Sequence, residues 1–592
     1  MSAPGRLSGW PAGDRWSWLL VAVLAAHTAL VAYSSLYHAP AWDEYAHLPS
    51  GILHWRDGDY RLYKTNPPLV RMIAALPLLF TDVAHQLPAA PADDRPEWRA
   101  AETFIELAGQ RLPRYYVWAR LMLLPLLLLG PLCTYLWARS LWGPAAGLAS
   151  AVLYCSSPTV LANSALMTPD AVAAALGVTA MFLYRRWLRD ATSIRKATLT
   201  GLALGAALAS KFTMMLLLPF WFMAPWWLLR RYGGTGRRRA LTLWLGQLVA
   251  AALLLNAVYR FQGTGASLAT FTFQSRRLQT LTHLVRRLPG GDGLPMPVPS
   301  QFLLGIDRQF AEFERGYWSY LRGTWKFGGW WYYYLYGLAV KEPTALWLLL
   351  GWFLLRAARR GFPFSEQCFL IGPAAVILGV LSAHTGFNHH IRYALPALPF
   401  VAVCCAAPIK SDRNARSQRR SMVGVRFAVV LVALAAGSSL SQWPHSESYF
   451  CWLAGGPRRG ALHLLDSNID WGQDVSYLAR WLREHPDQRV DGIIASVPFS
   501  VLRVFGLRRG SEPQWQRRIN ADGTISLSDP PAGRYAVFVR RIYESWAYHY
   551  FRFLEPRFWV SPSVRIYELR PEDIDRLRPH MRSCTCRFPR PP

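Results

Sequence analysis

The sequence predicts a polytopic α-helical membrane protein that ends in a small α/β domain. Hydrophobic residues make up 52% of the 592 residues and charged residues 17%, whereas soluble domains carry roughly 25% charged residues. Many apolar runs approach the length of about 20 residues that crosses a hydrocarbon core. After residue 441 the pattern changes to short strand-like runs and one amphipathic helix.

Eleven apolar runs are interpreted as membrane spans, and residues 1–441 as the membrane core. Two large loops, 39–114 and 261–334, interrupt this core. The first span has no small-residue cleavage site after it, so it is interpreted as a retained anchor. The predicted spans are 17–37, 115–137, 143–160, 166–187, 196–210, 212–229, 240–260, 335–355, 367–384, 392–409 and 423–441.

Basic residues set the predicted orientation. They cluster in the short connections after even-numbered spans, at 185–196, 230–239, 356–360 and 410–420. Such loops stay in the cytoplasm, so the N-terminus is predicted inside, and the two large loops and the tail outside. The net charge of +29 is largely explained by this topology. A nucleic-acid partner is therefore not predicted, whereas membrane lipids are.

The two outer loops carry different signals. In the first, "LPSGILHWR" and "PPLVRMIAALPLLF" predict helices lying in the membrane interface, and the Pro-rich "LPAAPADDRPEWRAAE" predicts a mobile surface segment. The second ends in "GYWSYLRGTWKFGGWWYYYLYG", a density of Tyr and Trp typical of an interfacial belt. An aromatic wall beside a sugar or lipid-chain site is the alternative interpretation, and both can hold.

The tail, 442–592, predicts an extracytoplasmic α/β domain. Its strands are "GALHLLD", "RVDGIIASV", "GRYAVFVRRIY" and "SVRIYELR", and its helix is "DVSYLARWLREH". Five of the eight Cys lie in apolar runs and are interpreted as packing residues. Cys451 could form a disulfide with Cys584 or Cys586, and the sequence does not distinguish these pairings.

Carboxylates are delivered to the predicted outer face by two segments. Asp43 and Glu44 follow the first span, and Asp170 begins the fourth. Asp43 and Glu44 could simply be solvated surface charges, and Asp170 could be an acidic residue that favours the start of a helix. Partial desolvation at a membrane edge would instead raise their proton affinity, as a general base requires. We therefore regard all three as candidate catalytic residues.

Cations reach the same predicted face from three further segments. Lys64, Lys211 and Arg392 are candidates for holding a phosphate, although Lys64 could simply extend from an interfacial helix. A charge between two spans, as at Lys211, indicates function by default. Other candidate substrate contacts are His384, His390 and Arg71. The His residues around 384–390 fit no metal-ligand motif, so no metal ligand is assigned and a divalent metal is left open.

Six motifs, in this order, resemble those of the GT-C membrane glycosyltransferases over residues 20–410. They are "WDEYAHLPSG", "YKTNPPLVR", "SPTVLANSALMTPD", "GLALGAALASKFT", "KEPTALWLLL" and "IRYALPALPF". The group that they resemble includes the bacterial protein O-mannosyltransferases and the aminoarabinose-transferase-like proteins. The tail segment "LLDSNIDWGQDVSYLARWL" is similar to one in uncharacterised bacterial members.

This resemblance implies an enzyme of the bacterial inner membrane. A sugar would pass with inversion from a polyprenyl-phosphate donor to a hydroxyl of a protein, lipid or glycan acceptor. Asp43 matches the catalytic carboxylate, and Lys64 the basic residue near the phosphate, although Thr65 and Asn66 follow it where family members often have an acidic residue. Asp170 and Lys211 match recurring polar positions.

Two other classes of function remain open on the sequence. A transporter or flippase of lipid-linked sugars would favour inverted repeats and broken helices near the midplane, and no repeat is visible. A non-catalytic scaffold of envelope assembly is the second, and the retained Asp43, Lys64 and Lys211 argue against it. Turnover of the donor separates the enzyme from both.

Overall fold

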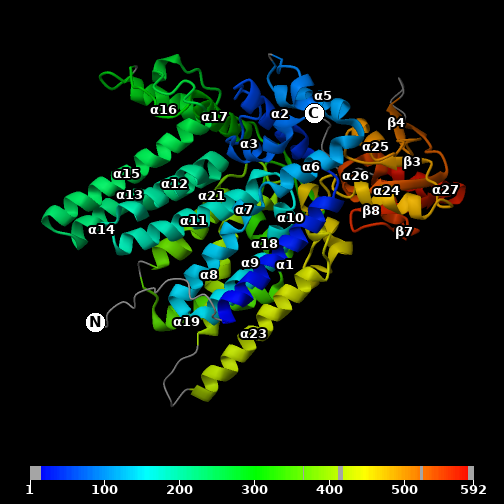
Figure 1. The fold of residues 1–592 in the computed structure, drawn as a ribbon. Helices are drawn as coiled ribbons and strands as arrows, with labels where there is room; N and C mark the ends of the chain where they lie inside the picture. Colours follow the sequence, from blue (N-terminus) through cyan, green and yellow to red (C-terminus); the bar gives the residue numbers. More distant parts are fainter. Residues whose placement is uncertain are drawn as a thin grey trace.

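The computed structural model describes residues 15–91, 93–291, 293–363, 366–410, 418–519 and 525–583. A bundle of helices forms most of the chain, with α16 and α17 at one end and the C-terminal strands beside it (Figure 1). The helices of the bundle are α1 (Arg15–Tyr37), α6 (Leu112–Leu121), α7 (Leu124–Leu127), α8 (Leu129–Trp142), α9 (Pro144–Ser156), α10 (Pro158–Ser164), α11 (Pro169–Arg189), α12 (Ile194–Ser210), α13 (Leu218–Phe222), α14 (Ala224–Arg231), α15 (Gly234–Val258), α18 (Tyr333–Lys341), α19 (Thr344–Arg360), α21 (Gly372–Ala383), α22 (Leu398–Cys405) and α23 (Gln418–Leu440).

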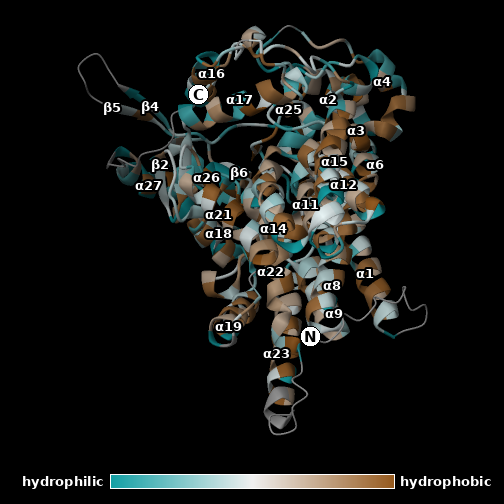
Figure 2. Cartoon of the chain, turned by 90° about the vertical axis from the view of Figure 1, so that its left-hand side faces the viewer, coloured by the Kyte–Doolittle hydropathy of each residue, from teal (hydrophilic) through white to brown (hydrophobic). Residues whose placement is uncertain are grey.

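Several of these helices are suited to crossing a membrane. Within the described ranges, six are long and apolar enough, or up to eight if each of two bent pairs counts as one span. Hydrophobic residues predominate along helices such as α1 and α22 (Figure 2). Composition and helix lengths thus support a multi-pass membrane protein. The described helices give at most eight spans by length and composition, and not the eleven predicted.

Two of the predicted spans are broken in the structure. The run 143–160 divides into α9 and α10, which are bent by 61°, and the run 335–355 divides into α18 and α19, bent by 117°. Each break precedes a proline, and the residue before it is extended, with ψ of 128° at Ser157 and 152° at Glu342. A proline disfavours the helical conformation of the residue before it, which a count of apolar residues overlooks.

The first outer loop is more deeply buried than the sequence predicted. Helix α2 (Trp42–Arg56) buries every residue from Glu44 to His54, so it packs inside the protein and this part of it presents no apolar face to lipid. The predicted mobile segment contains the start of α5 (Pro96–Ala108), where Pro96 and Glu97 are buried. The loop also contains α3 (Leu69–Ala75) and α4 (Asp82–Gln86).

Two glycines bring α12 and α15 into close contact. A Cβ atom at Gly201 would lie 2.7 Å from the backbone oxygen of Gln247, and one at Gly205 would lie 2.8 Å from that of Ala251. Small residues four positions apart allow membrane helices to approach this closely. The contact fixes α12, whose C-terminal end carries Lys211.

The second outer loop folds into α16 (Arg276–Arg286), α17 (Ser300–Arg315) and a hairpin of β1 (Trp318–Leu321) and β2 (Thr324–Phe327). In the tail, a four-stranded sheet has the order β3-β6-β8-β7. Its strands β3 and β6 are parallel, and the other pairs are antiparallel. The elements of the tail are β3 (Gly492–Ile494), β4 (Gln516–Ile519), β5 (Ile525–Ser528), β6 (Gly533–Phe538), β7 (Phe558–Trp559), β8 (Val564–Leu569), α24 (Val475–Glu484), α25 (Phe499–Val504), α26 (Val539–Glu544) and α27 (Pro571–Ser583).

Three of the four predicted tail strands are present as β3, β6 and β8. The fourth, "GALHLLD", is wrong, because Pro457–Leu462 form a 3-10 helix and the chain then leads into a second one, Asp466–Asn468. Cys451 is buried and its thiol donates to the backbone oxygen of Ala339. Its two predicted partners, Cys584 and Cys586, lie outside the described residues.

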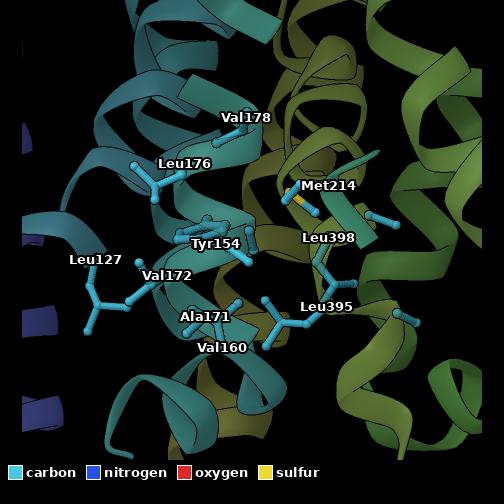
Figure 3. Packing of buried hydrophobic residues seen from close by; sticks show 14 of the residues in the cluster. Leu127, Tyr154, Val160, Ala171, Val172, Leu176, Val178, Met214, Leu395 and Leu398 are labelled. Carbon is cyan, nitrogen blue, oxygen red and sulfur yellow. The ribbon is translucent and has the colours of Figure 1, made fainter. Parts of the chain in front are cut away.

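The main hydrophobic core lies between the bundle helices. Figure 3 shows Val172 and Leu176 of α11 among side chains such as Tyr154 of α9 and Leu398 of α22. Tail residues from Tyr449 to Ile469 belong to this same cluster, whereas the sheet has clusters of its own. The first part of the tail is therefore packed into the bundle, where it reaches the polar groups described next.

Candidate active site

Five of the predicted residues line one cavity of about 420 Å³; one is His390, and the other four are charged. These four are Asp43 of α2, Asp170 of α11, Lys211 at the end of α12, and Arg392 in the 3-10 helix Ile391–Ala397. The other residues that line it are Trp42, His47, Tyr63, Thr65, Asn66, Arg95, Trp98, Pro169, Gln309, Glu312, Phe313, Tyr317, Phe387, His389, His390 and Tyr393.

The four charged groups form a connected chain of ion pairs. Arg392 donates from Nη2 to Oδ2 of Asp43 at 2.8 Å, and its Nε lies 3.8 Å from Oδ2 of Asp170. Lys211 donates to the other oxygen of Asp170. Exposed fractions are 23% for the Asp43 side chain and 4% to 7% for the other three. Asp43 is thus the most exposed of these four side chains.

Arg392 has spare capacity for hydrogen bonding. Its Nε and Nη1 atoms are buried and have no hydrogen-bond partner among the described residues. The tail covers it, because the guanidinium lies 3.6 Å from the centre of the Trp471 ring. A buried guanidinium with free N–H groups is suited to an anionic oxygen.

Each of these residues stands where a helix begins or ends. Asp43 and Asp170 lie in the first turns of α2 and α11, where carboxylates are favoured by the helix dipole. Lys211 is extended, with φ of −157° and ψ of 140°, and ends α12. Helix termini leave side chains and backbone groups free to face a cavity, so the ends of these helices create this site.

Burial raises the pKa of Asp43, and the Arg392 guanidinium opposes this shift without cancelling it. Burial also lowers the pKa of His47, which the Arg71 cation lowers further. Likewise, burial and the Arg392 cation keep the pKa of His390 well below its usual value. Both imidazoles are therefore neutral at physiological pH. Of these three groups, only Asp43 has a proton affinity above its ordinary value.

Glu44 faces the interior and not the cavity. Its side chain is fully buried and receives hydrogen bonds from Nε and Nη2 of Arg120, at 2.9 and 2.6 Å. It also accepts from the backbone N–H groups of Ala41 and Met167, at 2.7 and 2.8 Å. These contacts tie α2 to α6 and to the segment before α11. The predicted catalytic role does not fit this geometry, which instead positions the neighbouring Asp43.

Two cations of the first loop do not line the cavity. Lys64 is half-buried, and its neighbours Tyr63 and Thr65 line the cavity in its place. Arg71 is 3% exposed and donates to the backbone oxygens of Tyr63 and Asn66 and to Nε2 of His54. Arg71 therefore shapes the cavity wall through the backbone that it holds, and its predicted contact with substrate does not fit this burial.

A second cavity, of about 660 Å³, adjoins the first and is mostly apolar. Lys211, Gln309, Phe313 and Tyr393 line both cavities. His384 lines only the apolar one and accepts a 2.6 Å hydrogen bond from Arg277. The other residues that line the apolar cavity are Phe212, Thr213, Met215, Leu216, Leu278, Leu303, Ile306, Phe310, Val380 and Leu381.

His390 lines the polar cavity, and the tail holds it in place. Its Nδ1 lies 2.7 Å from Oγ of Ser467 and 3.8 Å from Oδ1 of Asp466. Sequence reasoning missed Tyr393, whose ring lies 4.6 Å from Nζ of Lys211, and it missed Trp471. Tyr393 stands beside Arg392 in a quoted motif, which could have indicated it. Trp471 lies in the quoted tail segment, which could have indicated it, but no local pattern places it beside Arg392.

The described part of the chain contains no group of three or more His, Cys, Asp or Glu side chains that could hold a metal ion. The carboxylates of the cavity are instead neutralised by Arg392 and Lys211.

Residues 99–263 match the family model described as dolichyl-phosphate-mannose-protein mannosyltransferase. The chain resembles this family. The resemblance predicted from the motifs is therefore confirmed, and the matched segment contains Arg120, Asp170 and Lys211. No curated protein matches the chain significantly in sequence.

Solved structures of low sequence identity also match. One is ArnT from Cupriavidus metallidurans bound to undecaprenyl phosphate, with 12% identity, 95% of this chain and 99% of that chain covered, and a TM-score of 0.43. A second is the Archaeoglobus fulgidus oligosaccharyltransferase, with 13% identity, 84% and 64% covered, and a TM-score of 0.43. A third is the S. cerevisiae Pmt1-Pmt2 complex bound to the sugar donor, with 17% identity, 43% and 34% covered, and a TM-score of 0.33.

Proposed function

We propose that this protein is a membrane glycosyltransferase that moves a sugar from a polyprenyl-phosphate donor to an acceptor hydroxyl, with inversion. One observation carries the proposal: a charged cavity continues into an apolar one, and Lys211 and Tyr393 stand at their junction. A donor of this class has the same composition, with a polar sugar phosphate joined to a long apolar tail. The family match over residues 99–263 supports the same reaction class.

The cations at the junction would hold the phosphate of the donor. Lys211 lines both cavities, and Arg392 offers two unpaired N–H groups within the described structure. As the bond between sugar and phosphate breaks, negative charge develops on the phosphate oxygens. Fixed cations in a buried site stabilise that charge more strongly than water would.

Asp43 would act as the general base. The acceptor oxygen attacks the anomeric carbon while the bond from this carbon to the phosphate oxygen breaks, and its electron pair leaves with the polyprenyl phosphate. The acceptor proton passes to Asp43. Asp43 suits this role because its side chain is more exposed than that of Asp170, the other carboxylate in this set of ion pairs. Its partial burial also raises its pKa.

Asp170 would hold both cations in position. It pairs with Lys211 and lies 3.8 Å from Arg392 at 4% exposure. The outer face is the proposed side of the membrane for the reaction, as the basic connections predict. A bacterial inner membrane remains part of the proposal.

The direct test supplies radiolabelled polyprenyl-phosphate sugars to the purified protein in lipid, with membrane extract as the acceptor source. Release of free polyprenyl phosphate that depends on Asp43 is the expected result, and the productive donor identifies the sugar. Donor that crosses the bilayer uncleaved would support a transporter instead. Binding without cleavage or movement would support a scaffold.

The rate should depend on pH through Asp43. Because a protonated carboxyl cannot accept a proton, kcat/KM is expected to fall as pH decreases through the Asp43 pKa. Burial raises this pKa above the ordinary value of 3.8, so the decline should begin at a higher pH than for an exposed Asp. Donor binding measured over the same range is the control, and a profile flat down to 3.8 would contradict the assignment.

Filling the apolar cavity should discriminate donors by tail length. Ile306 of α17 lines this cavity and is half-buried, so Ile306→Trp is expected to raise KM for a long-chain donor roughly tenfold. A donor with a short prenyl tail should be affected much less. Leu284→Trp on α16, at a side chain that is 54% exposed, is the matched control. An equal effect on both donors would rule out this cavity as the tail site.

A further inference from the structure

A third cavity, of about 390 Å³, adjoins the polar one. We propose that it binds the acceptor, and that the acceptor is a neutral, hydroxyl-rich carbohydrate. This inference rests on the proposed function and adds the substrate class of its second substrate. Its aromatic residues are Tyr317, Trp318, Tyr320, Trp325, Phe327 and Tyr333, and its other lining residues are Gly316, Asn388, His389, Leu465, Asp466, Arg540 and Glu544.

The β1–β2 hairpin presents an aromatic platform. Trp318 is paired with Phe327, and Tyr320 with Trp325, in the antiparallel register. Residues two apart on a strand share a face, as do directly opposed residues. All four rings therefore lie on one face of the hairpin, where ring centres are 6.1 Å apart in the first pair and 5.2 Å in the second. Flat aromatic faces suit the apolar C–H faces of a sugar ring.

The polar edge of this cavity comes from the tail. Nη2 of Arg540 lies 3.1 Å from Oε1 of Glu544 and 3.3 Å from Oδ2 of Asp466. All three side chains remain about a quarter exposed, at 24%, 24% and 23%. Nη1 of Arg541 lies 3.9 Å from Oε2 of Glu544, so two carboxylates are balanced by two guanidinium groups. Such an edge offers both acceptors and donors to hydroxyl groups, and it has no excess of cations that would select a phosphate or carboxylate.

The third cavity is connected to the polar one and separate from the apolar one. Tyr317 and His389 line both the third and the polar cavity. Asp466 of the third cavity also lies 3.8 Å from His390 of the polar cavity. The apolar cavity shares no lining residue with the third. A sugar on the aromatic platform could thus present a hydroxyl toward Asp43 while the lipid tail occupies the apolar cavity.

The backbone at Asp466 is held in an uncommon conformation. Its φ of +60° lies in the left-handed region, which non-glycine residues adopt only at an energetic cost. Asp466 contacts Arg540 from this position, and its own backbone leads directly into Ser467, which bonds His390. The tail therefore fixes the walls of both cavities through one short turn, as expected if the two substrates meet there.

The first experiment measures acceptor binding without any reaction. Tritium-labelled neutral tetrasaccharides of glucose, mannose, galactose and N-acetylglucosamine are equilibrated by dialysis against the full-length protein. Phe327→Ala is the main variant because this side chain is 58% exposed, so its removal should not disturb folding. Trp318→Ala is the second variant. Trp331→Ala is the matched control, at a ring that is 64% exposed and outside the cavity.

At least one tetrasaccharide is expected to bind the wild-type protein. Removing either platform ring should weaken binding roughly three- to tenfold, as for the loss of one aromatic contact, and Trp331→Ala should have no effect. A phosphorylated form of the same sugar should bind no more tightly than the neutral form, because the edge has no excess of cations. The proposal is overturned if no tetrasaccharide binds, if the two variants bind as tightly as wild type, or if only a Ser/Thr peptide or a phospholipid vesicle binds.

Donor turnover is measured separately in the same preparation. Asp43-dependent release of polyprenyl phosphate together with no carbohydrate binding would reject the acceptor site alone. Carbohydrate binding that depends on Phe327, without any donor turnover, would reject the proposed reaction and leave a carbohydrate-binding site. The two failures are therefore distinguishable.

Discussion

Replacing Asp43 with Asn is expected to reduce sugar transfer by roughly 10²- to 10⁴-fold, the usual contribution of a general base. The amide keeps the shape of the carboxyl group and can still accept a hydrogen bond from Arg392, but it cannot take a proton. The measurement is the rate of polyprenyl-phosphate release with saturating donor, alongside the donor Kd. The decrease should appear in kcat, with donor binding changed little.

Asp57→Asn is the matched control for this variant. Asp57 belongs to the same loop, is 28% exposed and pairs with Arg56 at 2.6 Å, and it does not line the cavity. Its replacement should leave kcat unchanged. Near-normal turnover in Asp43→Asn, or equal losses in the two variants, would refute the general-base role.

Replacing Glu44 with Gln should mainly reduce the stability of the protein, whereas Asp43→Asn should mainly reduce kcat. The substitution leaves the Arg120 guanidinium, which is 1% exposed, without its counter-charge. Breaking a buried ion pair from one side costs about 3–5 kcal/mol. The measurement is the temperature at which half of the detergent-solubilised protein loses its monodisperse elution. Below that temperature, folded Glu44→Gln protein should retain substantial turnover.

A double variant separates the ion pair from the other contacts. In Glu44→Gln/Arg120→Met no charge is left buried, so the double variant should be more stable than the sum of the two single losses predicts. Arg120 also donates to the backbone oxygens of Ser35 and His38 at the end of α1, so some loss should persist. Abolished turnover in a fully stable Glu44→Gln protein would restore Glu44 as a catalytic residue.

Much of the fold followed from local patterns. Apolar runs predicted most of the bundle helices, and alternation predicted β3, β6 and β8. Two of the errors have a common source, since the breaks at Ser157 and Glu342 both come from the following prolines. The burial of α2 was missed because hydrophobic residues in a short amphipathic run do not indicate whether they face lipid or protein.

The sequence by itself determined which segments carry charged residues to one end of the bundle, and Asp43, Asp170, Lys211 and Arg392 do share a cavity. The tertiary structure alone decided that Asp43 faces the cavity while Glu44 faces Arg120. Successive helical residues point about 100° apart, so only the packing around α2 assigns each carboxylate. It also placed Trp471 over Arg392, because such a contact depends on how the tail packs on the bundle and leaves no local pattern.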